Sequence, residues 1–316
     1  MKVGIVGATG LVGQAMLAVL QESSLSVQSI KLFASADSAG KTHIFRTSDL
    51  TVEIIKKEAL EKGMFILGAT SSSIASEWVP LALEAGAVVI DNSSAHRMDP
   101  DVPLVVPQVN PESITDKSRL IANPNCSTIQ LVMSLKPLMD LARFKWVSVS
   151  TYQSVSGAGR KGLSMLEKGE LNGPKPGAVH RNILCEIGEP EISGYTEEEL
   201  KLQRETVKIL EADFPVYPAC ARVPVAVGHT ESVTVRMEKP VPATLAAEAM
   251  KDFNGLKVVE RGFEPLLAQN TDETFVGRIR NHPGDRSILQ FWVTADNVRK
   301  GAALNAVQIL EMMAER

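Results

Sequence analysis

A glycine-rich turn close to the start of the chain constrains the fold more than any other feature of the sequence. Residues 2–6 are typical of a β-strand and run into Gly7-Ala8-Thr9-Gly10-Leu11-Val12-Gly13, after which apolar residues recur at helical spacing. Such a turn lets the backbone approach a pyrophosphate and directs helix N–H groups toward it. The order of strand, turn and helix therefore predicts a dinucleotide site, formed by Gly7, Thr9, Gly10, Leu11, Val12 and Gly13.

The residues that follow alternate between short apolar strands and helices. Strands are expected at 27–33, 65–68 and 87–91, with a helix at 73–85. This rhythm predicts a parallel, doubly wound sheet with the cofactor across the carboxyl ends of its strands. The loops that begin at positions 34, 69 and 92 should face the cofactor, and their candidate contacts are Ser35, Ala36, Ser38 and Ser71. Serines after a strand are also common as plain turn residues.

The pattern changes in the second half of the chain. Apolar and polar residues alternate in 145–155, 232–237 and 287–295, which is typical of strands with one covered face. With helices between them, these strands predict a second domain of α+β type with a mainly antiparallel sheet. Residues 297–313 are expected to form an amphipathic helix.

Composition narrows the class of protein. A chain of 316 residues with 44% hydrophobic and 22% charged residues is long enough for two domains, and its formal charge of −4 argues against nucleic acid or anionic membrane as a partner. No apolar run is long enough for a membrane span, and strand-like residues begin at Lys2, which leaves no room for a signal peptide. Three cysteines without a paired spacing fit a reducing cytoplasm and no zinc site.

One of these cysteines lies where a helix is expected to begin. Strand-like Leu120-Ile121 leads into Asn123-Pro124-Asn125-Cys126-Ser127-Thr128, and residues 129–135 read as a buried helix. The positive end of a helix dipole favours a thiolate, the form of cysteine that attacks electrophiles. Most free cysteines are small core residues, so the local pattern leaves both roles open.

The hexapeptide around Cys126 resembles the catalytic-cysteine signature of the aspartate-β-semialdehyde dehydrogenase family. Further stretches resemble that family in the same chain order, over essentially all 316 residues. The resemblance implies a Rossmann-type dinucleotide-binding domain at 1–125 and 297–316, to which the last helix returns. It also implies a catalytic and dimerisation domain at 126–296.

The implied reaction is the reversible, phosphorylating oxidation of L-aspartate 4-semialdehyde, on the pathway to lysine, methionine and threonine. Cys126 would attack the aldehyde carbon, and phosphate would cleave the resulting thioester. Residues 222–230 resemble the family segment in which an arginine binds the substrate carboxylate and a histidine is the base. The resemblance thereby selects Arg222, and it selects His229 among five histidines.

Other roles follow from the same resemblance. Gln153 would orient the substrate beside the sulfur, and Glu198 would contact the substrate amine. Phosphate would be held by Arg97, Lys201 and Asn125. Ser156, Gly157 and Asn297 would complete the cofactor site, and no metal is expected. Without the resemblance, Arg97 would be read as a loop cap, and Glu198 with Lys201 as a solvated pair on a helix beginning near Thr196.

The cofactor expected from the resemblance is NADP, although Asp37 departs from the usual pattern. An acidic residue roughly 20 residues beyond the glycine turn commonly binds an unphosphorylated ribose, as in NAD sites. Ser35, Ser38 and Lys41 favour the opposite choice, because hydroxyls and a cation could hold a 2′-phosphate while Asp37 turns outward. NAD is therefore kept as an alternative to NADP.

Three other classes of protein are alternatives to this function. Extended short-chain dehydrogenases share the glycine spacing but need a Tyr-x-x-x-Lys motif, which Tyr152, Tyr195 and Tyr217 do not provide. The others are an N-acetyl-γ-glutamyl-phosphate reductase-like enzyme and a non-catalytic dinucleotide-binding subunit. Expected partners are a small-molecule substrate, inorganic phosphate and further copies of the chain, as a homodimer or dimer of dimers. The Gly/Pro-rich stretch 172–179 is a candidate dimer contact.

Overall fold

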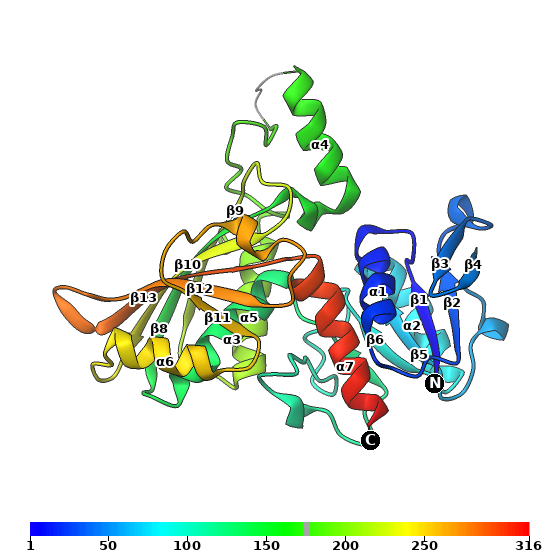
Figure 1. The fold of residues 1–316 in the computed structure, drawn as a ribbon, viewed down its shortest axis with the longest axis horizontal. Helices are drawn as coiled ribbons and strands as arrows, with labels where there is room; N and C mark the ends of the chain where they lie inside the picture. Colours follow the sequence, from blue (N-terminus) through cyan, green and yellow to red (C-terminus); the bar gives the residue numbers. More distant parts are fainter. Residues whose placement is uncertain (173–176, 316) are drawn as a thin grey trace. The chain divides into compact units, whose positions relative to one another are not determined.

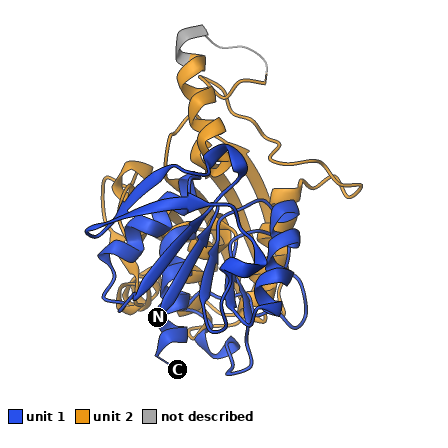
Figure 2. Cartoon of the chain, turned by 90° about the vertical axis from the view of Figure 1, so that its right-hand side faces the viewer, with its two compact units in different colours: residues 1–124, 302–316 blue, residues 125–301 orange. Residues whose placement is uncertain are grey.

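The computed structural model describes residues 1–172 and 177–315 and divides into two compact units. Unit 1 contains Met1–Pro124 and Ala302–Arg316, and unit 2 contains Asn125–Gly301 (Figure 2). The domain boundaries predicted above differ from these units only at Asn125 and at residues 297–301, which belong to unit 2. The centre of the candidate dimer contact, residues 173–176, lies outside the described residues.

The described part of unit 1 is built on a seven-stranded sheet with the order β3-β4-β2-β1-β5-β6-β7 (Figure 1). All neighbours in this sheet are parallel except β3 and β4, which form an antiparallel pair. The strands are β1 (Lys2–Val6), β2 (Ser29–Phe33), β3 (Thr42–Phe45), β4 (Ser48–Glu53), β5 (Phe65–Gly68), β6 (Val88–Asp91) and β7 (Leu120–Ala122).

Helices cover both faces of this sheet because its strands are apolar on both sides. Ile5 of β1 belongs to a core cluster with α1 (Leu11–Glu22) and α7 (Asn305–Ala314). Its neighbour Val6 belongs to a second cluster with α2 (Ser72–Glu84). Successive residues of a strand point to opposite faces, so the two clusters lie on opposite sides of the sheet. The predicted doubly wound fold is confirmed.

Unit 2 contains a six-stranded sheet, within the described residues, with the order β11-β12-β13-β10-β8-β9. The three central pairs are antiparallel and the two outer pairs are parallel, in agreement with the mainly antiparallel sheet expected from the sequence. The strands are β8 (Phe144–Gln153), β9 (Val216–Arg222), β10 (His229–Met237), β11 (Leu256–Val259), β12 (Thr274–His282) and β13 (Asp285–Ala295).

Three helices pack on this sheet: α3 (Cys126–Met139), α5 (Glu197–Leu210) and α6 (Ala243–Asp252). The alternation predicted for 145–155 is confirmed in β8, where Val147, Val149, Thr151 and Gln153 are buried. Helix α4 (Gly159–Asn172) projects from the rest of unit 2 (Figures 1 and 2). No helix in the described chain is both long enough and apolar enough to cross a bilayer.

The last segment differs from the single helix expected at 297–313. It begins with a π-helix, Arg299–Leu304, and continues as α7. The Asp296 carboxylate accepts hydrogen bonds from the N–H groups of Val298 and Arg299, and its carbonyl accepts the Gly301 N–H at 2.8 Å. The last bond spans five residues, so capture of these groups by Asp296 widens the first turn. π-helical turns of this kind are frequent at functional sites.

Candidate active site

Cys126 is the first residue of α3, as predicted, and the residue before it caps the helix. The Asn125 side-chain oxygen accepts hydrogen bonds from the N–H groups of Ser127 at 2.9 Å and Thr128 at 3.4 Å. An asparagine at this position satisfies N–H groups that have no partner within the helix. The half-buried Cys126 side chain therefore starts at the positive end of the α3 dipole.

The same asparagine ties α3 to α5. Its side-chain amide donates to Glu198 at 2.9 Å, and its backbone N–H donates to Glu205 at 2.7 Å. Glu198 and Glu205 lie two turns apart, on one face of α5, and Glu205 is buried. Glu205 was missed by the sequence analysis, although an acidic residue at this spacing from Glu198 was a usable signal.

Gln153, the last residue of β8, forms hydrogen bonds with both α3 and α5. Its amide donates to the Ser127 hydroxyl at 2.9 Å and to the Glu198 carboxylate at 2.8 Å. Glu198 is placed in the first turn of α5 because Thr196 and Glu199 form a capping box that fixes where the helix starts. The structure thus brings Asn125, Gln153 and Glu198 together beside Cys126.

Arg222 and His229 lie at the same end of the sheet. Arg222 ends β9 opposite Gln153, and His229 begins β10. The guanidinium donates to the Ser154 carbonyl at 2.8 Å, and His229 Nδ1 lies 3.1 Å from the Ser154 backbone nitrogen. Burial, and to a lesser degree the charge of Arg222, lowers the pKa of His229 well below its usual range.

Glycine is needed at two positions where the backbone lies close to predicted site residues. A Cβ at Gly157 would lie 2.7 Å from Arg222 Nη1 and 3.2 Å from His229 Nε2, and one at Gly301 would lie 2.8 Å from the Cβ of Cys126. Gly301 was missed by the sequence analysis because it lies 175 positions after the cysteine. Asn297 accepts the Gly228 N–H at 2.9 Å, so its amide is engaged within unit 2.

The predicted phosphate ligands make other contacts in the structure. Lys201 Nζ lies 3.8 Å from the Glu197 carboxylate, on the helix that carries Glu198. In unit 1 the buried Arg97 donates through Nε to the Asn123 carbonyl at 2.9 Å and through Nη2 to the Asn92 carbonyl at 2.6 Å. Arg97 therefore braces the turn that leads into the cysteine segment.

The glycine turn of unit 1 has the geometry expected of a dinucleotide site. Gly7 has a φ of +82°, and a Cβ at Gly13 would lie 2.2 Å from the Gly7 carbonyl oxygen. Ser38, in the 3₁₀ turn Ala36–Ser38, has its hydroxyl 3.3 Å from both the Thr9 hydroxyl and Lys41 Nζ. Asp37 is exposed. Ser35 and Ala36 are exposed too, and the Ser71 hydroxyl lies 3.1 Å from that of Ser73.

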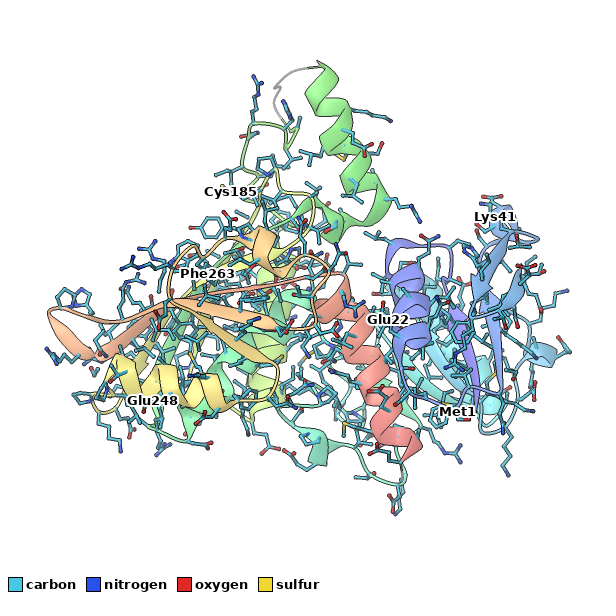
Figure 3. The ribbon with its side chains drawn as sticks, viewed as in Figure 1. Met1, Glu22, Lys41, Cys185, Glu248 and Phe263 are labelled. Carbon is cyan, nitrogen blue, oxygen red and sulfur yellow. The ribbon has the colours of Figure 1, made fainter. Side chains whose placement is uncertain are left out.

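The other two cysteines differ from Cys126 in their surroundings. Cys220 is buried in β9, and burial raises the pKa of its thiol, an effect that a hydrogen bond with Thr151 partly offsets. Cys185 is exposed on a loop (Figure 3). A thiolate at Cys220 is therefore disfavoured, and neither cysteine begins a helix.

A second row of side chains lies behind Arg222, Gln153 and His229. The sheet register pairs Thr151 of β8 with Cys220 of β9 and with Glu231 of β10. Each of these residues lies two positions inward along its strand from Gln153, Arg222 or His229. Glu231 is fully buried. Burial raises the pKa of the Glu231 carboxyl well above its usual range, and the amide of Gln130 offsets only part of this effect. Burial therefore favours the neutral form of this carboxyl in the folded protein.

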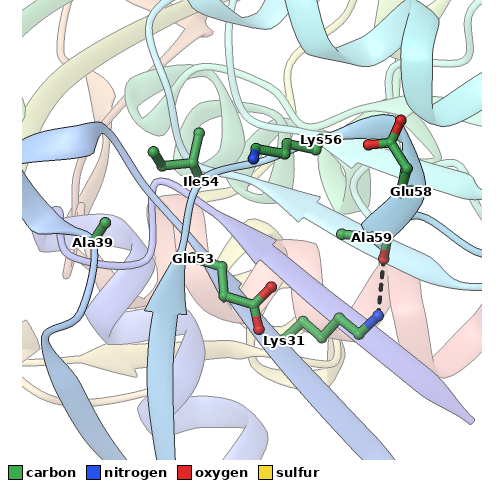
Figure 4. A pocket seen from close by; sticks show the side chains of 7 residues that line it. All are labelled: Lys31, Ala39, Glu53, Ile54, Lys56, Glu58 and Ala59. Carbon is green, nitrogen blue, oxygen red and sulfur yellow. Dashed lines mark hydrogen bonds between the residues drawn. The ribbon is translucent and has the colours of Figure 1, made fainter.

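Unit 1 also contains a cavity of about 560 Å³ that includes none of the predicted site residues. Lys31 crosses it and donates to the Ala59 carbonyl at 3.0 Å (Figure 4). In residues 1–172 and 177–315, no group of three or more His, Cys, Asp or Glu side chains could hold a metal ion.

Comparison with known proteins identifies the family. Residues 2–117 match the model of the semialdehyde dehydrogenase NAD binding domain, and residues 135–300 match that of the semialdehyde dehydrogenase dimerisation domain. The aspartate-semialdehyde dehydrogenase of Aquifex aeolicus is 45% identical, over 99% of this chain and 98% of its own. The chain belongs to the aspartate-semialdehyde dehydrogenase family.

Solved structures of this family agree with the fold. Aspartate semialdehyde dehydrogenase II of Vibrio cholerae, crystallised in complex with ASA, has a TM-score of 0.94 and 39% identity, over 99% of this chain and 98% of its own. The enzyme from Candida albicans, crystallised with NADP, has a TM-score of 0.76 and 26% identity, over 99% and 98%. The resemblance and the two-domain fold class are confirmed, and the roles of individual residues stay predictions.

Gly301→Ala should displace the predicted nucleophile, Cys126, without unfolding either unit. The added Cβ would meet Cys126 at 2.8 Å, and a shift of about 1 Å in a reacting group can cost up to ~100-fold in rate. We expect dehydrogenase turnover to fall at least about tenfold, with dinucleotide binding retained. Gly284→Ala is the matched control, because the Cβ at Gly284 would meet only the flexible His282 ring, at 3.3 Å. Equal turnover in the two variants would contradict the contact.

Glu231→Gln should raise the free energy of unfolding near pH 7 and change it little near pH 4. Above the ordinary carboxyl pKa the unfolded chain loses the Glu231 proton while the folded chain keeps it, so wild-type stability falls as pH rises toward the elevated folded pKa. The free energy of unfolding of the wild type falls by up to about 1.4 kcal/mol per pH unit in this range, and the uncharged amide of the variant abolishes this dependence. Urea unfolding at fixed protein concentration checks this, with the exposed Glu248→Gln as control. Parallel pH profiles for wild type and Glu231→Gln would contradict it.

Proposed function

We propose that the protein is an NADP-dependent, phosphorylating aldehyde dehydrogenase that converts L-aspartate 4-semialdehyde and phosphate reversibly to 4-phospho-L-aspartate. The observation that carries the proposal is Cys126 at the capped start of α3, with Gln153 and Glu198 linked to its cap. Arg222 and His229 lie at the same end of the unit 2 sheet. Membership of the family supports the choice of substrate.

The reaction requires a nucleophile that can hold an acyl group and release it. The Cys126 thiolate adds to the aldehyde carbon, a hydride leaves from the adduct, and a thioester remains on the sulfur. Phosphate then attacks the thioester carbon and displaces the thiolate, which regenerates Cys126. The oxidised product carries the phosphate, and one proton is released for each turnover.

Charged groups beside the cysteine match the ends of the substrate. The planar guanidinium of Arg222 can bind the α-carboxylate in a bidentate manner, and its contact with the Ser154 carbonyl fixes its orientation. Glu198 can accept hydrogen bonds from the α-ammonium group. Because Gln153 donates to Glu198, it sets the position of that carboxylate relative to Cys126.

NADP, when bound, accepts the hydride. The glycine turn of unit 1 fits it, because side chains at Gly7 and Gly13 would collide with backbone and the bare turn lets the pyrophosphate approach. Thr9, Ser38 and Lys41 converge where two hydroxyls and a cation suit a 2′-phosphate. The remaining proposed contacts are Gly10, Leu11, Val12, Ser35, Ala36, Ser71, Ser156, Gly157 and Asn297.

Arg97, Lys201 and Asn125 are proposed to hold the attacking phosphate. Two of them carry the positive charge that a phosphate dianion requires, and Asn125 lies at the start of α3, where helix N–H groups favour an anion. The position of Lys201 supports this role, because it lies on α5 three residues after Glu198 and therefore on the same face of the helix.

We propose further that the enzyme acts as a homodimer or a dimer of dimers in the cytoplasm. Unit 2 matches a dimerisation-domain model, and Met165, Ile183, Ile192 and Tyr217 of this unit expose apolar side chains that a second copy could cover. A reducing compartment would keep the exposed Cys185 and the catalytic thiol from oxidation.

The direct test is NADPH formation from L-aspartate semialdehyde with and without inorganic phosphate. With phosphate, we expect sustained turnover. Without it, we expect formation of about one NADPH per active site, because the thioester has no acceptor. Phosphate-independent turnover would overturn the phosphorylating reaction, and absence of NADPH under both conditions would overturn the activity.

Cys126→Ala should abolish turnover while NADP binding is retained. Loss of a nucleophile lowers kcat by several orders of magnitude, because the covalent route is closed. Steady-state kinetics and NADPH fluorescence titration measure the two properties, and the exposed Cys185→Ala serves as control. Turnover within about tenfold of wild type in Cys126→Ala would exclude covalent catalysis at this residue.

Asp37→Arg should strengthen the preference for NADP over NAD. A carboxylate about 4 Å from a 2′-phosphate would repel it by roughly 4 kcal/mol before screening and rotation reduce this value. Because Asp37 is exposed, it can turn outward, which leaves wild type with a weakened preference for NADP. The ratio of kcat/KM for the two cofactors in both proteins decides the matter. An unchanged ratio would place Asp37 away from the ribose, and a wild-type preference for NAD would overturn NADP.

A further inference from the structure

Two carboxylates of α5 hold the residue that precedes Cys126. Asn125 donates its backbone N–H to Glu205 at 2.7 Å and its side-chain N–H to Glu198 at 2.9 Å. Because these glutamates lie about two helical turns apart, both carboxylates are on one face of α5. One helix face thus fixes the peptide group and the side chain of Asn125 separately.

The Asn125 N–H depends on Glu205 because regular secondary structure offers it no acceptor. β7 ends at Ala122 and α3 begins at Cys126, so Asn125 lies between a strand and a helix. N–H groups at the start of a helix have no partner in the intrahelical ladder. Burial of a backbone N–H without an acceptor is costly. The carboxylate of Glu205, which is 1% exposed, supplies the acceptor.

The two carboxylates differ in whether a substrate can reach them. Glu198 is half-buried, and its Oε1 accepts hydrogen bonds from both Asn125 and Gln153. The proposed function assigns the same carboxylate to the substrate ammonium group, so Glu198 is shared between Asn125 and the ligand. Glu205 is shielded from solvent. Its hold on Asn125 therefore does not involve a group that substrate uses.

We propose that Glu205 is a positioning residue for catalysis, which holds the Asn125 peptide and thereby keeps Cys126 in place while substrate and phosphate bind and leave. The cysteine follows Asn125 directly, so rotation of that peptide would carry the sulfur with it. A shift of about 1 Å in a reacting group can cost up to ~100-fold in rate. Glu205 acts through Asn125 and touches no reacting atom. The inference deepens the proposed function and rests on it for the role of Cys126 as nucleophile.

Amide hydrogen exchange tests this hydrogen bond directly in the complete protein labelled with ¹⁵N-asparagine. Loss of one backbone signal in Asn125→Ser assigns the Asn125 N–H. Glu205→Gln keeps an oxygen acceptor, so exchange should stay slow, whereas Glu205→Met has a similar length and no oxygen. We expect exchange at Asn125 to become at least about tenfold faster in Glu205→Met, because the amide opens to water more often. Unchanged exchange in Glu205→Met would overturn the inference.

Steady-state kinetics separate positioning from substrate binding. We expect Glu205→Met to lower kcat for NADPH formation at least about tenfold, with KM for L-aspartate semialdehyde within about threefold of wild type. KM should change little because Glu198 and Arg222 keep their own contacts. Glu205→Gln should recover most of kcat. Wild-type kcat in Glu205→Met, a loss that appears only in KM, or an equal loss of kcat in both variants would overturn the positioning role.

Thr206→Val is the matched control, because Thr206 is the next residue of α5, is also buried, and has a hydroxyl without a hydrogen-bond partner among the described residues. The change alters the same helical turn without removing a hydrogen bond to Asn125, so we expect kcat within about twofold of wild type. A loss equal to that of Glu205→Met would indicate a general disturbance of α5 and would overturn the inference.

Two further arms keep the outcomes distinct. If Glu205→Met does not fold, Glu205→Asp takes its place with the same expected results, because its shorter side chain withdraws the carboxylate from Asn125. If wild type forms NADPH and the variant matches it, only this inference fails. If wild type forms none, the proposed function fails, and exchange of the Asn125 N–H still decides whether Glu205 holds the peptide.

Discussion

The rest of the site depends on the hydrogen bonds of the Asn125 side chain. It caps α3 through the N–H groups of Ser127 and Thr128, and it binds Glu198 of α5 through its own amide. Its backbone N–H is held by Glu205. These contacts fix the start of α3, and with it Cys126, against α5. A nucleophile needs this precision more than it needs any particular neighbour, because misplacement of the sulfur affects every later step.

The sheet of unit 2 carries the other predicted site residues at one end of its strands. Gln153, Arg222 and His229 stand at strand ends that the register brings together, whereas the next row inward contains a buried thiol and a buried carboxyl. The proposed substrate-binding groups are thereby separated from a thiol and a carboxyl whose charged forms are disfavoured by burial. The low pKa of His229 and the high pKa of Glu231 have the same cause, which is burial at the centre of this sheet.

Much of the fold could be predicted because its signals are local. The strand and glycine turn at residues 2–13, the helix that begins at Cys126 and the alternation in β8 all depend on residues a few positions apart. The contacts of Gly301 with Cys126 and of Ser154 with His229 join segments distant in sequence, and periodicity carries no information about which segments meet. The π-helix was missed for a related reason, since it depends on the capture of N–H groups by Asp296.

The central claim is that Cys126 carries the substrate as a thioester, and mass spectrometry of the trapped enzyme tests it most directly. The protein would be mixed with L-aspartate semialdehyde and NADP in the absence of phosphate, quenched in acid and digested. The account predicts one aspartyl group on the peptide that contains Cys126, removed when phosphate is added before the quench. An enzyme that forms NADPH but carries the acyl group on Cys185 or Cys220, or on no residue, would contradict it.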